Sequence, residues 1–303
     1  MAGIQLESAS HKVCFLCNAV LDRASHKRRS LMFQRLHKYY ECKKCHAFSL
    51  YPILDKNEVK KLYSNNYIQD VNPEFNVKEF DHEDRFKDLH KLLKAKSATE
   101  KLFFLDYGCS TNPENLVIAK SLGFFAYGVE VEEDARTQAH SVSGCPILST
   151  GEIINCNLHF DIIFLGDVLE HLTDPLKVLG HLGSLLNPGG LLVIQGPLEG
   201  ARTLSNFLIS IKARIRWMKP ADFPPYHVSL ATRKSILQAL VTSDFTLQQI
   251  IITEPQWPAP KMGSKESFTS ASLFVFSLTK IVDILLSRNF SNFGTRFYAV
   301  VEK

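Results

Sequence analysis

The chain has 303 residues, of which 45% are hydrophobic and 22% are charged, and its 35 Lys and Arg residues exceed its 31 Asp and Glu residues to give a formal net charge of +4. This composition excludes a disordered tail, and a nearly neutral charge gives no basis for a nucleic-acid partner. The length allows two domains, so we expect a globular protein with a large α/β domain and a smaller appendage.

Four of the seven cysteines form two pairs near the N-terminus. Two residues separate the members of each pair, and the four positions are Cys14, Cys17, Cys42 and Cys45. One tight turn can present two such thiolates to a tetrahedral ion, and two turns close a four-thiolate shell that leaves no position for substrate. The spacing therefore predicts a structural Zn²⁺ in a zinc-ribbon domain of residues 1–52, whose folding would depend on the metal. Buried free thiols are the alternative.

Two further features lie in the first hundred residues. The basic run at 26–29 falls where a ribbon would have its hairpin, and we interpret it as a solvated loop, with nucleic-acid contact as the alternative. Residues 53–95 carry apolar residues at steps of three and four, which predicts connecting helices. The start, MAGIQLESASHK, lacks the apolar run of a secretory signal, so we expect a cytoplasmic protein with reduced thiols.

A strand, a tight turn and a helix are expected from residue 101 onward. An apolar run at 101–105 ends in Asp106 and Gly108, and the residues up to 123 have helical spacing. A second strand at 124–131 ends in Glu130, where dinucleotide-type folds bind a ribose diol. Ser110 and Asn112 stand where the usual pattern has glycine; asparagine can adopt a positive φ at modest cost.

Strands and helices alternate through the rest of the chain. Further strands are expected at 146–149, 160–165, 191–195, 245–254 and 294–303. A turn at 187–190 precedes the strand at 191–195 and also prevents residues 178–198 from forming one membrane-spanning helix. Pro175 begins a helix capped by Thr173 or Asp174, and residues 267–286 form a helix on the sheet. The alternation predicts a mostly parallel, doubly wound sheet.

Four motifs of this unit resemble those of class I S-adenosylmethionine (SAM)-dependent methyltransferases. In order they are LDYGCSTN, FFAYGVEVEEDA, FDIIFLGDVLEHLTDP and LLNPGGLLVIQGP, and they cover roughly residues 101–200. The preceding segments CFLCNAV, YYECKKCHAFSLYPIL and KKLYSNNY resemble the zinc-ribbon head of one subgroup. That subgroup includes bacterial methyltransferases that modify nucleotide-linked sugars and other precursors of surface carbohydrates or natural products.

The resemblance implies a seven-stranded Rossmann-like methyltransferase domain at 96–303, with a substrate-side insertion around 201–230. It implies that SAM is the cofactor and assigns its contacts by motif. Asp106 and Gly108 would border the methionine part, Glu130 would bind the ribose hydroxyls, and Glu152 would lie near the adenine amine. Ile153 would pack on the purine, and Asp167 is grouped with these cofactor-binding residues.

Catalysis needs a nucleophile held in line with the methyl group, and a hydroxyl nucleophile also needs its proton removed. His171 and His227 are the candidates for this role, and Tyr226 could share proton transfer or orient a sugar. His171 could instead be structural, and Asp167 with Glu170 could form a capping box. A third possibility is that these two carboxylates and the two histidines bind a divalent ion.

The residues after 200 are expected to face the acceptor. Several basic residues there could pair with a diphosphate, namely Arg202, Lys212, Arg214, Arg216 and Lys219. An amphipathic surface helix that contacts a membrane or another subunit is the alternative. We therefore predict a methyltransferase acting on a small phosphorylated or nucleotide-linked acceptor. The alternatives are an RNA-directed methyltransferase that uses the ribbon to bind nucleic acid, and a SAM-binding protein without turnover. The sequence does not fix the oligomeric state.

Overall fold

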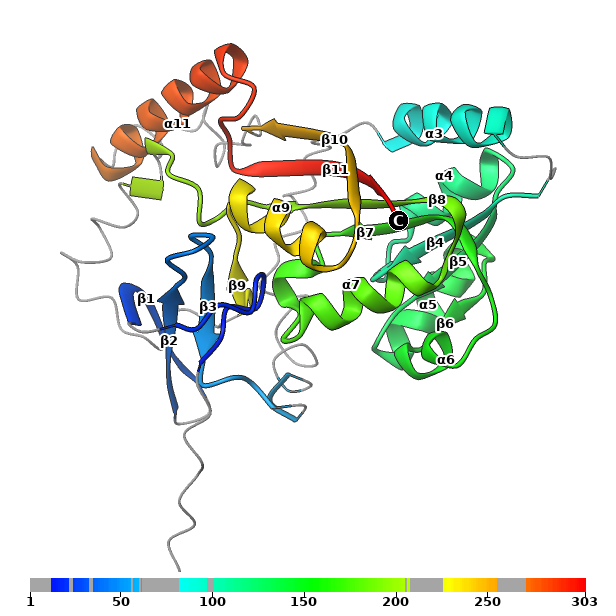
Figure 1. The fold of residues 1–303 in the computed structure, drawn as a ribbon, viewed down its shortest axis with the longest axis horizontal. Coiled ribbons are helices and arrows are strands. Elements are labelled where there is room, and N and C mark those ends of the chain that lie inside the picture. The colour runs from blue at the N-terminus through cyan, green and yellow to red at the C-terminus, as the bar shows by residue number, and fades with distance from the viewer. Residues whose placement is uncertain are drawn as a thin grey trace, which may run out of the picture.

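The computed structural model describes residues 12–21, 24–32, 35–55, 57–59, 61, 82–96, 101–204, 206–207, 226–254 and 271–303. Two β-sheets organise this part of the chain (Figure 1). The larger has seven strands in the order β10-β11-β8-β7-β4-β5-β6. Their bounds are β4 Phe103–Tyr107, β5 Phe125–Val129, β6 Ile147–Leu148, β7 Phe160–Gly166, β8 Leu186–Pro197, β10 Thr246–Thr253 and β11 Arg296–Glu302.

Strands β6, β5, β4, β7 and β8 are parallel, whereas β11 pairs antiparallel with both β8 and β10. This confirms the predicted sheet. The strand order reverses between β4 and β7, so the carboxyl ends of these two strands form the switch point where ligands of such sheets bind.

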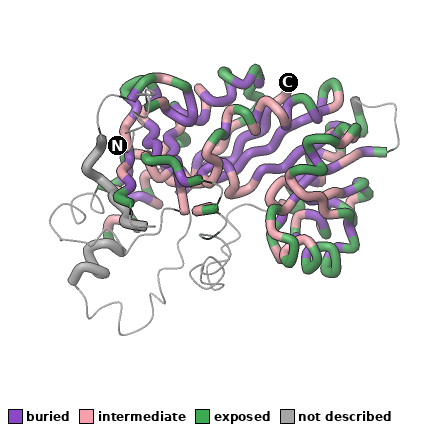
Figure 2. Tube along the Cα trace, turned by 90° about the horizontal axis from the view of Figure 1, so that it is seen from below, coloured by how far each residue is buried: buried purple, intermediate pink, exposed green. Residues whose placement is uncertain are grey.

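Helices cover both faces of the larger sheet. They are α3 His82–Lys96, α4 Glu114–Ser121, α5 Glu133–Ser143, α6 Thr150–Ile154, α7 Pro175–Ser184, α9 Arg233–Thr242 and α11 Ala271–Asn289, with a 3₁₀ turn at Leu169–His171. Alternate residues of β7 serve the two faces. Ile163 and Leu165 share an apolar cluster with residues of α7 and α9, whereas Ile162 and Phe164 share one with residues of α3 and α4. The central strands β4, β7, β8 and β11 are accordingly mostly buried, and buried residues run through the middle of the molecule in Figure 2.

Local signals set several boundaries. The Asp174 side chain accepts a hydrogen bond from the Lys177 amide and Pro175 begins α7, so Asp174 rather than Thr173 is the cap. Residues 187–190 lie inside β8 instead of before it, because the register against β7 shifts between Phe160 and Ile162 and a bulge accommodates them.

The smaller sheet has the order β1-β2-β3-β9 and contains β1 Ala24–Met32, β2 Arg35–Glu41, β3 Phe48–Tyr51 and β9 Ser229–Leu230. The basic run at 26–29 is part of β1, so its assignment to a loop was wrong. The run contains none of the Gly, Pro, Asn or Asp residues that favour tight turns, and it lies in a strand that pairs with β2, with Arg29 opposite Lys38 and an irregularity in register between Ala24 and Arg29.

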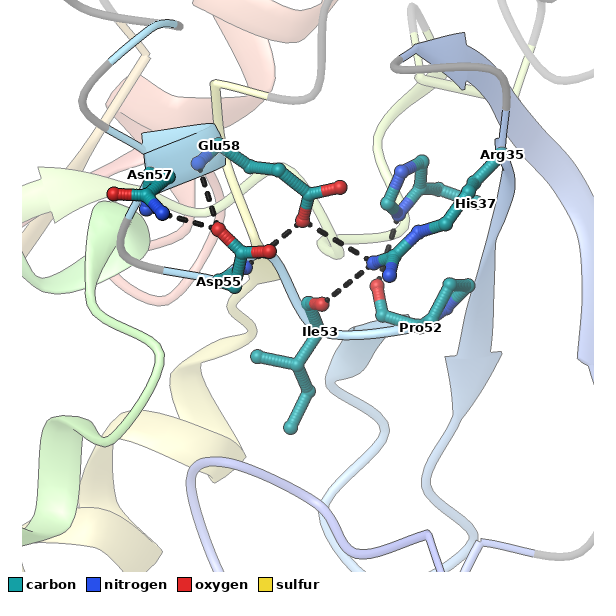
Figure 3. Close-up of polar contacts among 7 residues, drawn as sticks. All are labelled: Arg35, His37, Pro52, Ile53, Asp55, Asn57 and Glu58. Carbon is teal, nitrogen blue, oxygen red and sulfur yellow. Dashed lines mark hydrogen bonds and ion pairs between the residues drawn. The ribbon is translucent and has the colours of Figure 1, made fainter. Parts of the chain in front are cut away.

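A polar cluster joins the smaller sheet to the start of the connector (Figure 3). Arg35 donates to the Ile53 carbonyl oxygen at 3.0 Å and to the Glu58 carboxylate at 3.2 Å. Asp55 and Glu58 form a reciprocal cap, since Asp55 Oδ1 accepts from the Glu58 amide and Glu58 Oε2 accepts from the Asp55 amide. Residues 57–59 and 61 are helical, as are 82–96, which confirms helices at both ends of the expected connector.

The C-terminal helix α11 corresponds to the helix expected at 267–286. It packs near the end of β10, where Lys280 pairs with Glu254, and its buried Asp283 accepts from the Leu204 amide at 3.0 Å. No helix among the described residues is both long and apolar enough to cross a membrane. Lys212, Arg214, Arg216 and Lys219 lie outside the described residues; Arg202 is exposed on the loop after β8.

Candidate active site and metal centre

The four predicted thiols converge at the base of the smaller sheet. Their sulfur atoms all lie within 4.8 Å of one another and all four residues are buried. Cys14 Sγ lies 3.5 Å from Cys45 Sγ, and Cys17 Sγ lies 3.6 Å from Cys42 Sγ. A tetrahedral Zn²⁺ with Zn–S bonds of about 2.3 Å would separate its sulfurs by about 3.8 Å. The donor set therefore fits such an ion with little movement.

The two cysteine turns have the same backbone form. Asn18 and His46, the residues after the second cysteine of each pair, have φ values of 55° and 63°. The Cys14 and Cys42 amides each donate, at 2.8 Å, to the carbonyl oxygen of the alanine five residues later. Matched turns of this kind present all four thiols to one point, which buried free cysteines would not require.

The turn after β4 lies at the switch point. Gly108 has a φ of 90°, and Ser110 takes a left-handed φ of 57°. The Ser110 amide donates to Glu130 Oε2 at 3.0 Å, which brings the predicted ribose-binding carboxylate against this turn. Asparagine at position 112 could have adopted a positive φ, but the left-handed non-glycine residue of this turn is Ser110, and Asn112 is not among the residues with positive φ.

Asp106 lies at the end of β4 and is buried. Burial raises the pKa of its carboxyl to about 7, although a hydrogen bond with Asn115 opposes this shift. Asn115 Oδ1 also lies 2.6 Å from His82 Nδ1, so the first residue of α3 reaches the same edge. Nothing in the local sequence marked His82, because its partners come from α4 and β8.

Residues of α6 differ in accessibility. Glu152 is exposed, and its carboxylate accepts from the Ser149 amide at 2.7 Å, which lowers the pKa of Glu152. Ile153 is fully buried in the core cluster, so it cannot offer a face to a purine and that assignment was wrong. The position of Ile153 on the short helix α6 turns its side chain toward the sheet, whereas the side chain of the next residue, Ile154, is 63% exposed.

Asp167 forms an ion pair that the sequence did not reveal. Both of its carboxylate oxygens contact Arg296 at the start of β11, at 2.5 and 2.8 Å, and Gln195 donates to Oδ2 at 3.4 Å. The suggested capping box of Asp167 with Glu170 is absent from this turn, since the N-cap of the 3₁₀ helix is Val168 and no side chain caps this helix. Because β11 is antiparallel, its first residue lies at the same edge as the carboxyl ends of the parallel strands.

His171 and His227 meet beside Glu170. One ligand atom from each of these three side chains lies within 4.8 Å of the others, and the imidazole centroids are 4.8 Å apart. Asp167 does not belong to this group. His171 Nδ1 donates to the Tyr226 carbonyl oxygen at 2.9 Å, and His227 Nδ1 lies 3.2 Å from Glu199 Oε2. The hydrogen bond to Tyr226 places a proton on Nδ1 of His171, so an uncharged His171 ring carries its lone pair on Nε2.

Burial sets the protonation of the deeper members of this cluster. Burial, together with the charge of Asp167, raises the pKa of Glu170 to about 8. Burial, followed by the proximity of His227, lowers the pKa of His171 to about 4. At neutral pH His171 is thus an uncharged ring. His227 is the more accessible histidine, with 31% of its side chain exposed against 15% for His171.

We call the carboxyl ends of β4 and β5, with Asp106, Gly108, Ser110 and Glu130, the predicted cofactor edge, and Glu170, His171 and His227 the histidine cluster. The two regions lie in contact at Gly108. A Cβ on Gly108 would lie 2.4 Å from Val168 Cγ2, so the turn after β4 packs directly against the turn that carries Glu170 and His171. Glu199 and Tyr39 were also missed by sequence reasoning; Tyr39 Oη donates to the His227 carbonyl oxygen at 2.5 Å across 188 positions of the chain. No local pattern marks a contact of that separation.

Comparison with known families agrees with this architecture. A family model described as a methyltransferase domain matches residues 78–250, which is more than half of the chain. The chain belongs to this methyltransferase family. It is a SAM-dependent methyltransferase with a Rossmann-like sheet.

Among curated proteins, this methyltransferase is similar to the ubiquinone biosynthesis O-methyltransferases of Caulobacter vibrioides and Caulobacter sp. strain K31. Each is 25% identical over 134 residues, or 42% of this chain and 53% of the relative. The chain thus spans about half the length of the curated relatives it matches.

Solved structures of similar fold include a SAM-dependent methyltransferase from Archaeoglobus fulgidus (17% identity, 78% of this chain and 100% of that chain, TM-score 0.48). The plantazolicin methyltransferase BamL, solved with a triazolic analogue and S-adenosylhomocysteine (SAH), is another (13% identity, 80% of this chain and 93% of that chain, TM-score 0.49).

Proposed function

We propose that the protein transfers the methyl group of SAM to a hydroxyl oxygen of a small polar acceptor, with a nucleotide-linked sugar as the first class to test. The pairing of His227 Nδ1 with Glu199 carries this proposal. In this arrangement Glu199 would orient the His227 ring, Nε2 would take the proton of the acceptor hydroxyl, and the carboxylate would stabilise the ring once it is charged. The curated relatives are named as O-methyltransferases, which supports oxygen as the acceptor atom.

The residues of the cofactor edge have separate roles in this proposal. When bound, SAM supplies an electrophilic methyl group on a sulfonium. Gly108 lets the backbone approach the methionine part beside Asp106, Glu130 binds the ribose hydroxyls, and Glu152 lies toward the adenine. Asp167 acts indirectly, because its pair with Arg296 fixes the turn that leads to His171. Tyr226 supplies the carbonyl that orients His171.

The N-terminal cysteines complete the proposal. We assign them a structural Zn²⁺, supported by four buried sulfurs with the separations that a tetrahedral shell needs. We also retain the division into a ribbon at 1–52, a connector at 53–95 and a methyltransferase domain at 96–303 with a substrate-side insertion around 201–230.

A divalent ion at Glu170, His171 and His227 is a second candidate arrangement. It is favoured by the convergence of three ligand atoms and by the engaged Nδ1 atoms of both rings, the usual second-shell pattern of metal-binding histidines. A bound ion would supply a Lewis acid for two acceptor oxygens. The ligands would then be uncharged imidazoles and an ionised Glu170.

His227→Asn tests the proposal. We expect turnover to fall by about 10²- to 10⁴-fold with SAH affinity within twofold, since His227 lies on the acceptor side. Turnover should fall less in Glu199→Gln. His159→Asn, at the exposed amino end of β7, is the matched control and should keep its turnover. Unchanged turnover in His227→Asn would remove the histidine from the mechanism.

The rivals give different results in the same assay. A chelator is added under conditions in which zinc stays bound to the four cysteines. Turnover that survives this treatment supports His227 as the base, whereas turnover that is lost and is restored by Mg²⁺ or Mn²⁺ supports the divalent site. Salt-sensitive methylation of RNA would favour the nucleic-acid alternative. SAH binding without transfer to any acceptor would favour a protein that has lost turnover.

A further inference from the structure

The segment that carries His227 belongs to the ribbon's sheet rather than to the methyltransferase sheet. Strand β9 pairs antiparallel with β3, through Phe48 with Leu230 and Ser49 with Ser229. The Leu50 amide donates to the Val228 carbonyl oxygen at 2.9 Å. A two-residue strand has too few backbone bonds to persist alone, so its position depends on the strand beside it.

The ribbon also contributes side chains to this segment. Tyr39 of β2 is 6% exposed, and its hydroxyl donates to the His227 carbonyl oxygen. Val228 and Leu230 are buried in an apolar cluster with Leu54 of the connector and with ribbon residues, which are Phe15, Tyr39, Phe48 and Leu50. The hydrophobic core of the ribbon is thus completed by the residues that follow His227.

On its other side the same segment is bonded to the turn after β7. The Val228 amide donates to the Glu170 carbonyl oxygen at 2.9 Å, and His171 donates to the Tyr226 carbonyl oxygen. The backbone on either side of His227 is therefore bonded both to the ribbon and to the turn after β7.

The cysteine cluster connects to this segment by one further bond. Thr232 Oγ1 donates to the Cys45 carbonyl oxygen at 2.8 Å, across 187 positions of the chain. Thr232 is also the N-cap of α9, since its hydroxyl accepts from the Ser235 amide. A change in the turn at Cys45 is thereby transmitted to the end of the His227 segment that enters α9.

We propose that Tyr39 is a positioning residue for His227, and that the metal-loaded ribbon holds this histidine at the acceptor site. The expected loss of turnover rests on the function proposed above, whereas the expected change in the position of His227 does not. The ribbon thus supplies part of the acceptor side, while the SAM side is built from β4 and β5 and is independent of it.

The test compares Tyr39→Phe with Tyr40→Phe in the zinc-loaded protein. Tyr40 is the next residue of β2, points to the opposite face and packs on Tyr51, so its substitution removes the same atom without facing His227. We expect Tyr39→Phe to shift the ¹³C-labelled ring resonance of His227 and to lower kcat about five- to tenfold, the effect of one lost hydrogen bond, with SAH affinity within twofold. Tyr40→Phe should change neither.

Reversible zinc removal from the wild type is the second measurement, since it needs no variant to fold. The His227 ring and Val228 amide resonances should shift and return on reloading, while the Ser110 amide on the cofactor edge should not move. A stationary His227 resonance in Tyr39→Phe or after zinc removal would overturn the proposal. Absence of methyl transfer by the wild type, with the His227 shifts present, would instead refute only the proposed function.

Discussion

Gly108 offers the sharpest test of how the cofactor edge is built. Its φ of 90° is strained for any side chain, and an added Cβ would lie 2.4 Å from Val168 Cγ2. The left-handed backbone costs about 1–2 kcal/mol for an L residue, and overpacking adds about 1–3 kcal/mol because valine is stiff at χ1. Gly108→Ala should therefore lower the free energy of unfolding by about 2–5 kcal/mol.

Gly123 supplies a matched control. It has the same φ of 90°, but an added Cβ would meet no atom within 4 Å. Gly123→Ala should therefore cost only the backbone share, about 1–2 kcal/mol. Gly123 also precedes β5, at the amino edge of the sheet. SAH affinity should therefore be unchanged in Gly123→Ala and weakened in Gly108→Ala.

Urea denaturation and calorimetric SAH binding on zinc-loaded protein measure both effects. Adding Val168→Ala removes the atom that clashes, so the double variant should recover the packing share of the loss in Gly108→Ala but not the backbone share. Equal losses in the two glycine variants, or no recovery in the double variant, would refute the inferred contact between the turns after β4 and β7.

Three further predictions follow from the same geometry. Ser110→Gly should raise the free energy of unfolding by about 0.5–1 kcal/mol in urea denaturation, because glycine adopts the left-handed φ without strain. The hydrogen bond from the residue-110 amide to Glu130 remains in this variant, so a loss of stability would contradict the reasoning. The raised pKa of Glu170, about 8, means that its stabilising contribution is fully present below its usual value of 4.5 and is lost as pH rises through 8. The free energy of unfolding of the wild type should accordingly fall by roughly 4 kcal/mol relative to that of Glu170→Gln between pH 5 and 8.5, as measured by urea denaturation at each pH. Parallel pH profiles of the two proteins would show that burial does not raise the pKa of Glu170. Chelation of the cysteine-bound zinc should make the ribbon susceptible to proteolysis between residues 12 and 55 while the methyltransferase sheet stays resistant, as read by mass spectrometry of the fragments; equal resistance with and without zinc would argue against a metal-dependent ribbon.

Features with a local cause could be predicted from the sequence. The apolar runs of β4, β5 and β7 are set by burial within a doubly wound sheet, and the Asp174-Pro175 pair sets the start of α7. The cysteine spacing predicted a cluster that the fold brings together. Each of these signals acts within a few residues, where propensity and periodicity determine the outcome.

Partners separated by most of the chain could not be predicted in the same way. Arg296 contacts Asp167 only because β11 lies next to β8 and runs antiparallel to it, and Tyr39 reaches His227 only because β9 joins the ribbon's sheet. The burial of Ile153 instead of Ile154 depends on which face of α6 turns toward the sheet, and a helix of five residues is too short for its sequence pattern to determine that face. These contacts follow from strand order and packing, which no local pattern encodes.

Backbone strain at the switch point explains how a degenerate glycine motif can keep its turn. Ser110 and Asp167 both have left-handed φ values, 57° and 54°, and they lie on the two turns that Gly108 and Val168 bring into contact. Each left-handed conformation costs about 1–2 kcal/mol, yet each residue is held by a specific partner. The Ser110 amide donates a hydrogen bond to the Glu130 carboxylate, and the Asp167 carboxylate forms an ion pair with Arg296. Hydrogen bonds and an ion pair thus stabilise here a conformation that glycine would adopt without help. Because the backbone amides, not the missing glycine, define the shape of the cofactor edge, loss of the second glycine does not imply loss of SAM binding.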